Sequence, residues 1–345
     1  MRKIGYLFFK VWLRSAIRCY YTKIKVEGLP QVPSGKPIMF LANHQNALLD
    51  ALLIATHCKR KPYFLTRSDV FRSTALKRLF EFLRMIPVYR IGDGKDSLKG
   101  NAAIFKRCSD LLQKGEAILV FPEGNHSLKR RVRPLSKGFA RILFLTLEIK
   151  PSLDIGIIPI GVNYANAAKF PDKAALCYGK EIKVQDFFDK KDISGSVSRL
   201  REEVSYQLKK LTTHIEDEAR YDDIVQKLEG SDVDYLNPKA VNLVLEKEVM
   251  PRPKAKDKIS GIKTLFKGLL MVLNLPMIFL WSQFVKPKVT ALEFLSTTRF
   301  MFALLIYPLQ CLIILFGLLT FLNWPAALII YSTYLILNSL LIKLL

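Results

Sequence analysis

The chain has 345 residues, of which 53 are Lys or Arg, 30 are Asp or Glu and 50% are hydrophobic. This length excludes a small disulfide-stapled scaffold, and this apolar fraction excludes a disordered chain. No paired spacing typical of a disulfide framework or a zinc site is found among the five cysteines, Cys19, Cys58, Cys108, Cys177 and Cys311. We therefore expect reduced thiols and no metal site.

The net charge of +23 is unevenly distributed. Residues 1–150 contain 29 basic and 10 acidic side chains, whereas residues 300–342 contain no charged side chain. Nucleic-acid binding does not require an uncharged apolar tail, so we expect no nucleic-acid partner. Basic residues gain attraction beside anionic lipid headgroups and favour the cytoplasmic face of a membrane. The pattern predicts an integral membrane protein whose basic half lies on the cytoplasmic side.

Residues 1–22 have the pattern of an amphipathic helix. Lys10, Arg14 and Arg18 recur every four residues, and aromatic and aliphatic side chains fill most of the remaining helix surface. This arrangement is typical of a helix that lies in the membrane interface. It lacks the long apolar stretch of a cleavable signal peptide. The alternative is an amphipathic helix packed against its own domain.

Residues 23–228 alternate between strand and helix patterns. We expect strands over residues 24–27, 37–41, 117–121, 155–164, 176–178 and 181–184, and helices over residues 47–56, 102–112 and 197–211. This alternation predicts an α/β domain with a mixed, largely parallel sheet flanked by helices. The polar residues 229–258, which include three prolines, are expected to form a linker.

The uncharged tail is long enough for two membrane crossings. The 43 residues between Arg299 and Lys343 would extend roughly 65 Å as helix, about twice a ~30 Å hydrocarbon core. Proline stops a helix and tryptophan favours the interface, so Asn323-Trp324-Pro325 is the expected turn. Residues 300–345 are therefore predicted to contain a transmembrane hairpin with helices over 300–322 and 326–343.

Residues 259–299 contain a third apolar stretch, Gly268–Trp281, which is only 14 residues long and is interrupted by Asn274 and Pro276. Such a length is more typical of a re-entrant or interfacial segment than of a full span. A crossing would also place the basic residues that follow it on the side opposite the basic N-terminal half. We therefore expect residues 259–299 to form a re-entrant or interfacial segment.

A candidate general base follows the predicted strand at residues 37–41. His44 stands at a strand-to-helix junction, and Asp50 follows about one and a half helical turns later. A carboxylate that holds one imidazole nitrogen leaves the other able to take a proton from a hydroxyl near neutral pH. The alternative is that His44 caps the helix and Asp50 is an ordinary, partly buried acid.

A second candidate segment, Phe121–Ser127, follows another apolar strand and contains the tight-turn sequence Pro-Glu-Gly. Gly124 allows a ligand to approach the backbone closely. A run of cations that can hold a phosphate or a coenzyme pyrophosphate comes next: Lys129, Arg130, Arg131, Arg133 and Lys137. Alternatively, these cations form a solvated loop that contacts anionic lipid.

Together these segments resemble the glycerolipid acyltransferase superfamily, which joins an Asn-His…Asp motif to a Phe-Pro-Glu-Gly motif. Glu123 lies 79 positions after His44, and two further blocks match in the correct order, Ile86–Arg90 and Ile158–Tyr164. The five residues between His44 and Asp50, where the superfamily usually has four, are similar to the fungal-type glycerol-3-phosphate/dihydroxyacetone-phosphate acyltransferase branch.

The resemblance implies a membrane-bound O-acyltransferase. It would transfer a fatty acyl chain from acyl-CoA or acyl-carrier protein to a hydroxyl of 1-acylglycerol-3-phosphate or glycerol 3-phosphate, without a cofactor. The partners implied are membrane lipids and the acyl donor. Catalysis would fall to His44 and Asp50. The acceptor-binding residues implied are Arg90, Phe121, Pro122, Glu123, Gly124, Asn125, His126, Arg130, Arg131, Arg133 and Lys137.

One departure bears on the acceptor. The superfamily usually continues its Phe-Pro-Glu-Gly motif with Thr-Arg, and here Asn125 and His126 stand in those positions. The resemblance assigns phosphate binding to that arginine and to the position of Arg90. An unphosphorylated lysolipid, such as an acylated amino acid, is therefore an alternative acceptor. A non-catalytic, membrane-anchored lipid-binding protein is an alternative from a different class.

Overall fold

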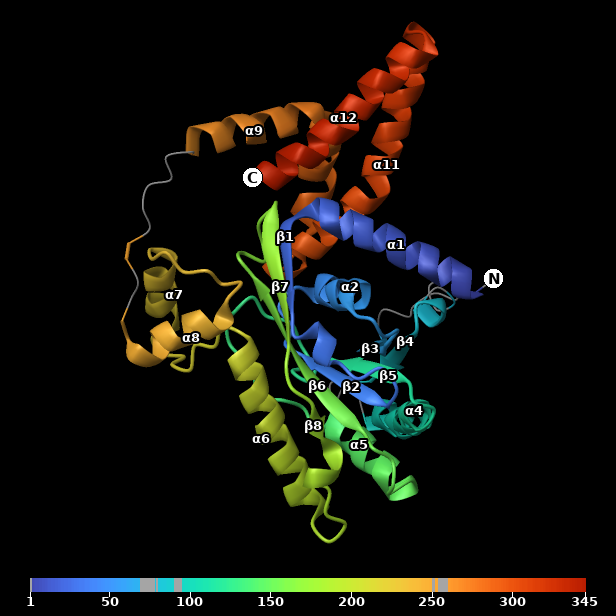
Figure 1. The fold of residues 1–345 in the computed structure, drawn as a ribbon, viewed down its shortest axis with the longest axis vertical. Helices are drawn as coiled ribbons and strands as arrows, with labels where there is room; N and C mark the ends of the chain where they lie inside the picture. Colours follow the sequence, from blue (N-terminus) through green and yellow to red (C-terminus); the bar gives the residue numbers. More distant parts are fainter. Residues whose placement is uncertain (1, 69–77, 79, 90–94, 250–251, 254–259) are drawn as a thin grey trace.

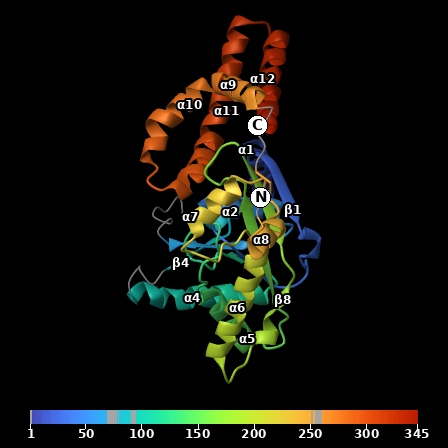
Figure 2. The same cartoon turned by 90° about the vertical axis from the view of Figure 1, so that its left-hand side faces the viewer.

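The computed structural model describes residues 2–68, 78, 80–89, 95–249, 252–253 and 260–345 (Figure 1). An α/β domain forms the lower part of the molecule in Figure 1, and the C-terminal apolar helices gather at its upper end. Figure 2, turned by 90°, shows the same separation.

The α/β domain is built on one eight-stranded sheet with the order β1-β7-β6-β2-β5-β3-β4, and β8 pairs with β6. Most neighbouring strands are parallel, and β6 runs antiparallel to β7 and β8. The predicted fold class, a mixed and largely parallel sheet flanked by helices, is confirmed. The strands are β1 Tyr21–Glu27, β2 Ile38–Ala42, β3 Tyr63–Arg67, β4 Met85–Val88, β5 Ala117–Val120, β6 Gly156–Tyr164, β7 Asp172–Tyr178 and β8 Ile182–Lys183.

The sequence of β2 shows why helices cover both faces of the sheet. Ile38 and Phe40 pack into one hydrophobic cluster, whereas Met39 and Leu41 pack into another. All five residues of β2 are buried, which is typical of a strand covered on both sides. The first cluster includes α1 (Arg2–Tyr20) and α2 (Ala47–His57), and the second includes α4 (Lys95–Gln113), α5 (Gly138–Ile149) and α6 (Ile193–Leu211).

Helix α1 is amphipathic along its length but is used differently at its two ends. Leu13 and Ile17 are buried in the domain core, so the second half packs against the protein itself. Ile4 and Phe8 are exposed by 76% and 73%, which leaves the first half with an apolar surface. The second half therefore packs as the alternative of a helix on its own domain describes, and the interfacial location of the first half stays a prediction.

The expectation of a linker over residues 229–258 is wrong for its central part. Helix α8 (Pro238–Lys247) begins at Asn237, whose side chain accepts from Ala240 N, and Pro238 occupies the first turn. Proline without a free N–H is favoured at that position, so Pro238 starts a helix here instead of marking a linker. Helix α8 packs with α7 (Tyr221–Glu229) in a small third hydrophobic cluster beside α6.

Two C-terminal helices are long and apolar enough to cross a membrane, α11 (Leu295–Phe321) and α12 (Trp324–Leu344). They pack against each other and join at Asn323, whose side chain accepts from Ala326 N. These helices match the predicted hairpin and associate the protein with a membrane.

The preceding apolar segment is a bent pair of helices, α9 (Ser260–Leu273) and α10 (Leu275–Leu280) with its continuation to Lys288. The bend is 86°, which is typical of a broken span or a re-entrant segment. Buried Asn274 stands at the break, donates to Leu270 O at 3.0 Å and reaches Asn338 of α12. Gln310 of α11 also donates to the Asn274 side chain, at 3.3 Å. Side-chain hydrogen bonds thus hold the bend against both long helices.

Candidate active site

Three neighbouring strands bring the predicted chemical segments together. β6, β2 and β5 lie side by side in parallel, so their carboxyl ends share one edge of the sheet. The chain leaves β2 into His44, leaves β5 into Phe121, and ends β6 at Tyr164. Sites in open α/β sheets form at such an edge.

Asn43 fixes the point at which the chain leaves β2. Its side-chain amide donates to Val162 O at 3.0 Å and accepts from Val162 N at 2.7 Å, so it joins the end of β2 to β6. Ala47, the first residue of α2, has a φ of 41°, a left-handed conformation that non-glycine residues seldom adopt. This turn accommodates the five residues between His44 and Asp50 and brings the two side chains together.

Asp50 is fully buried, and its carboxylate accepts the hydrogen bonds at the centre of the site. Its Oδ2 lies 2.7 Å from His44 Nδ1 and accepts from the backbone N–H groups of Gln45 and Asn46, each at 2.8 Å. Its Oδ1 accepts from the Tyr164 hydroxyl at 2.5 Å. A buried carboxylate with four donors has its acceptor capacity met and has one fixed orientation.

This environment determines the tautomer of His44. An ionised carboxylate is only an acceptor, so Nδ1 of His44 donates to Asp50 and Nε2 of the neutral ring carries the free lone pair. The His44 side chain is 16% exposed, whereas Asp50 is 0% exposed. His44 therefore has the orientation and access required of a general base, and the capping alternative considered from the sequence does not account for its bond to Asp50.

The Phe121–Ser127 segment closes over His44. The ring of Phe121 stacks on the imidazole with centroids 4.0 Å apart, and His126 meets it edge-on at 5.5 Å. Ser127 N donates to His44 O at 3.0 Å, which ties the two motif segments together. Burial and the neighbouring His44 lower the pKa of His126, so His126 is neutral at pH 7 and does not replace an arginine.

Glu123 points into the domain and pairs with Arg133. Its side chain is 2% exposed, and its Oε2 accepts from Arg133 Nη2 at 2.6 Å and from Nε at 2.7 Å. Burial raises the pKa of Glu123 to about 7, although Arg133 opposes that shift. Pro122 is buried and Gly124 has a φ of 76°, which forms the tight turn expected from the sequence. Glu123 therefore braces the turn beside His44.

Arg130 makes several contacts within the protein. It donates to Tyr164 O at 3.0 Å and to Ala165 O at 2.7 Å, and its guanidinium lies 3.4 Å above the ring centroid of Tyr235. Two of its donor nitrogens already meet backbone carbonyls, and the expectation that Arg130 binds the acceptor phosphate stays a prediction. Its position holds Tyr164, which in turn bonds Asp50.

The other cations that were predicted to bind the acceptor differ in their contacts and locations. Arg131 pairs with Glu218 at 3.1 Å, and Arg133 is committed to Glu123 and to the carbonyl of Asn125. Lys137 is exposed at the start of α5. Arg90 lies outside the described residues. The structure therefore brings His44, Asp50 and the Phe121–His126 turn together, and it commits the 130–133 arginines to protein partners.

The first turn of α11 belongs to the same site. Thr297 Oγ1 donates to Asn46 O at 3.0 Å, and Ser296 Oγ donates to Ala167 O at 2.6 Å. Phe294, just before α11, packs on His126 with ring centroids 4.5 Å apart. Thr297, 251 positions from Asn46 in the sequence, thus helps to hold the turn that carries His44.

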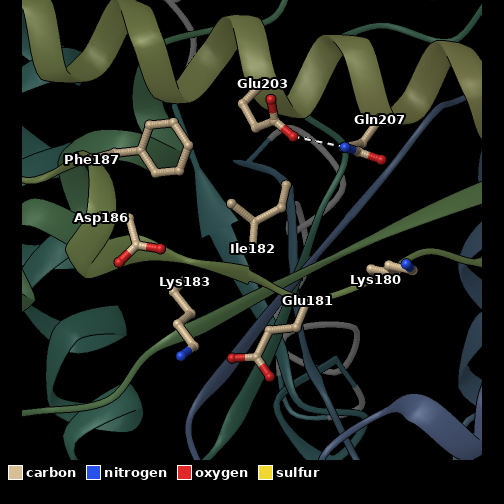
Figure 3. Close-up of a pocket in the computed structure, with 8 residues that line it drawn as sticks. All are labelled: Lys180, Glu181, Ile182, Lys183, Asp186, Phe187, Glu203 and Gln207. Carbon is tan, nitrogen blue, oxygen red and sulfur yellow. Dashed lines mark hydrogen bonds between the residues drawn. The ribbon is translucent and has the colours of Figure 1, made fainter.

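No group of three or more His, Cys, Asp or Glu side chains arranged to hold a metal is found in the described part of the chain. A surface hollow of about 430 Å³ is lined by residues just before β8, on β8, in its following turn and on α6. Figure 3 shows these side chains. β8 pairs with Gly156 and Ile157, the first residues of β6, so this hollow lies at the sheet edge opposite His44. It contributes nothing to the site.

Comparison with known proteins identifies the domain. The family model described as Acyltransferase matches residues 23–163, which include His44, Asp50 and the Phe121–His126 turn. The chloroplastic 1-acyl-sn-glycerol-3-phosphate acyltransferase LPAT1 of Arabidopsis thaliana is 28% identical over 160 residues, 46% of this chain and 41% of that protein. Residues 23–163 thus form an acyltransferase domain. This part of the chain is similar to acyltransferases of glycerolipid precursors.

Two further similarities complete the comparison. Glycerol-3-phosphate O-acyltransferase 2 of Saccharomyces cerevisiae is 28% identical over 117 residues, 33% of this chain and 15% of that protein. The crystal structure of the 1-acyl-sn-glycerophosphate acyltransferase PlsC from Thermotoga maritima aligns with a TM-score of 0.44 and 17% identity, covering 60% of this chain and 81% of that one. The chain spans less than half the length of the curated relatives it matches.

Sequence reasoning missed Tyr164, Asn43 and Thr297 as parts of the site. Tyr164 ends the fourth matching block, so its place at the carboxyl end of a buried strand was the available signal. Asn43 precedes His44 directly, and its role depends on the pairing of β2 with β6. No sequence signal connects Thr297 with Asn46.

Proposed function

We propose that this chain is a membrane-bound O-acyltransferase that transfers a fatty acyl chain from a thioester donor to a hydroxyl of a glycerolipid precursor. The observation that carries the proposal is His44, whose Nδ1 is held by buried Asp50 while Nε2 is free to accept a proton. Its place in the matched acyltransferase domain supports the same reaction.

In the proposed reaction, His44 Nε2 takes the proton of the acceptor hydroxyl. The hydroxyl oxygen then forms a bond to the thioester carbonyl carbon, and the carbon–sulfur bond breaks. The leaving thiolate takes the proton back from the imidazolium, which yields an ester and a free thiol. Asp50 stabilises the transient imidazolium because it is a buried anion 2.7 Å away. The scheme uses no metal and no cofactor, with acyl-CoA or acyl-carrier protein as donor.

The proposed acceptors are 1-acylglycerol-3-phosphate and glycerol 3-phosphate, the compounds named for the plant and yeast relatives. The second candidate is an unphosphorylated lysolipid. It is supported by the commitment of Arg130, Arg131 and Arg133 to protein partners and by the lowered pKa of His126. The excess of basic residues in the first 150 positions supports a catalytic domain on the cytoplasmic side.

The test is acyl transfer by the purified full chain in detergent micelles, with radiolabelled acyl-CoA or acyl-carrier protein and each acceptor in turn. We expect His44→Ala to abolish transfer because a methyl group accepts no proton. His57→Ala is the matched control, since His57 lies at the far end of α2 and contacts Leu53 O. Turnover by folded His44→Ala close to that of the unmodified protein would refute the mechanism. Lipid binding without transfer by the unmodified protein would indicate a non-catalytic lipid-binding protein.

A further inference from the structure

A groove of about 390 Å³ lies outside the matched acyltransferase domain. It is formed between the segment after α10 and the start of α11, which lie side by side in Figure 2. We call it the C-terminal groove. Its lining is apolar except for one cation and two hydroxyls, and it comprises Phe284, Val285, Lys288, Val289, Phe294 and Thr298, together with Thr290.

The C-terminal groove adjoins the reaction centre. Phe294, one of its lining residues, contacts His126, and His126 contacts His44. Thr297, next to lining residue Thr298, bonds the backbone of the His44 turn. The groove is therefore connected to His44 through Phe294 and His126, and part of its wall belongs to the start of α11, a helix long and apolar enough to cross a membrane.

The ammonium group of Lys288, the cation in this groove, is able to bind an anionic ligand. Lys288 is exposed and makes no ion pair with any described residue. By contrast, Arg130, Arg131 and Arg133 already meet carbonyls or carboxylates. A single ammonium matches one phosphate group, whereas a coenzyme pyrophosphate requires several cations.

We propose that the C-terminal groove binds the lipid acceptor, a single-chain lipid with an anionic headgroup, and that Lys288 is its headgroup ligand. This inference rests on the proposed function and identifies its acceptor site. The hydrocarbon chain lies against Phe284, Val285 and Val289, where burial of apolar surface stabilises it. The headgroup meets Lys288, and the glycerol part extends past Phe294 and His126 toward His44. A lipid reaches this site directly from the membrane.

The first experiment compares Lys288→Gln with Lys286→Gln, because Lys286 is an exposed neighbour that does not line the groove. We expect Lys288→Gln to raise the KM for 1-acylglycerol-3-phosphate about 2- to 5-fold, the range for loss of one solvent-exposed ion pair. The KM for the acyl donor stays within twofold, and Lys286→Gln behaves as the unmodified protein. Equal effects of both substitutions, or a shift in donor KM alone, would overturn the proposal.

The second experiment tests the apolar wall with Val289→Asn and acceptors of short and long chain. We expect the substitution to remove most of the preference for a long acceptor chain while leaving the preference for donor chain length unchanged. A changed donor preference would assign the groove to the acyl donor and overturn the proposal. Circular dichroism of each variant verifies that the helices are intact.

A binding measurement separates this inference from the proposed function. Calorimetric titration of His44→Ala with 1-acylglycerol-3-phosphate in detergent needs no turnover. Weaker binding in His44→Ala/Lys288→Gln, with no change in His44→Ala/Lys286→Gln, supports the groove even if the unmodified protein transfers no acyl group. Equal binding by the two double variants would overturn the groove assignment even if the unmodified protein is an active acyltransferase.

Discussion

Replacing Asp50 by asparagine tests the electrostatic part of the mechanism without removing the shape of the site. Three donors converge on Oδ2, and one, the Tyr164 hydroxyl, meets Oδ1. The backbone N–H groups of Gln45 and Asn46 favour an oxygen at the Oδ2 position. The amide nitrogen of the new side chain is therefore expected to face Tyr164, whose hydroxyl can turn and accept. The fold and the His44 tautomer should both survive.

The expected effect is the loss of one charge from beside the imidazolium. A hydrogen bond to a charged group is worth about 1.5–3 kcal/mol, and each 1.36 kcal/mol in the barrier is about tenfold in rate. We therefore expect Asp50→Asn to lower kcat about 10- to 150-fold. Had the amide nitrogen faced His44 Nδ1, the wrong tautomer would be held, and a loss near 10⁴-fold is typical of that case.

Steady-state acyl transfer at saturating donor and acceptor measures this effect, with thermal unfolding as a check that the variant is folded. His57→Ala again serves as the control. A folded Asp50→Asn enzyme with kcat within threefold of the unmodified protein would refute a role for the Asp50 charge. A loss near 10⁴-fold would refute the orientation that we deduce from the two backbone donors.

Three further predictions follow from other contacts. Tyr164→Phe should lower kcat about tenfold in steady-state assays and leave both KM values unchanged, because it removes a donor from Asp50 without touching substrate. Arg130→Ala should lower the unfolding temperature, with a stability loss of at least ~2 kcal/mol in thermal unfolding, and should leave the acceptor KM unchanged. Burial raises the pKa of Glu123 from about 4.5 to about 7, so the folded state binds the proton more tightly than the unfolded state. The contribution of Glu123 to stability should therefore be fully present below pH 4.5 and be lost, by about 3 kcal/mol, as pH rises through 7, and Glu123→Gln should remove this part of the profile in denaturant titrations across pH.

Local sequence patterns predicted the parts of the fold that depend on local forces. The fully buried strands β2, β5 and β6 are continuous apolar runs, and the break between α11 and α12 has a proline where a helix begins. The short strands β3 and β4 were missed because four or five residues of mixed polarity show no clear alternation. They are strands because β3 pairs with both β4 and β5. Pro238 was misread because the same residue ends one element or starts another according to its context.

The candidate site also contains residues that the local sequence places and residues that only the tertiary fold brings together. His44 and Asp50 are six positions apart, so a turn followed by a helix places them together, and the sequence was enough to pair them. Tyr164 is 114 positions from Asp50, and only the parallel pairing of β6 with β2 brings it there. The charge of Arg130 is visible in the sequence, whereas its contacts with the Tyr164 carbonyl and the Tyr235 ring depend on tertiary structure.

The apolar hairpin also orients the acyltransferase domain, because hydrogen bonds fix both ends of the hairpin to that domain. At one end, Thr297 and Ser296 bond the backbone beside His44 and at Ala167. At the other, Lys343 near the end of α12 donates to the carbonyls of Arg18 and Tyr21, where α1 meets β1. Two fixed points restrain a helical pair in tilt and in rotation, so the orientation of the domain relative to the membrane is set by these contacts. Because the first of them touches the His44 turn itself, the same hydrogen bonds that orient the domain also shape the active site, and the side of the domain that carries His44 is the side that faces the apolar helices.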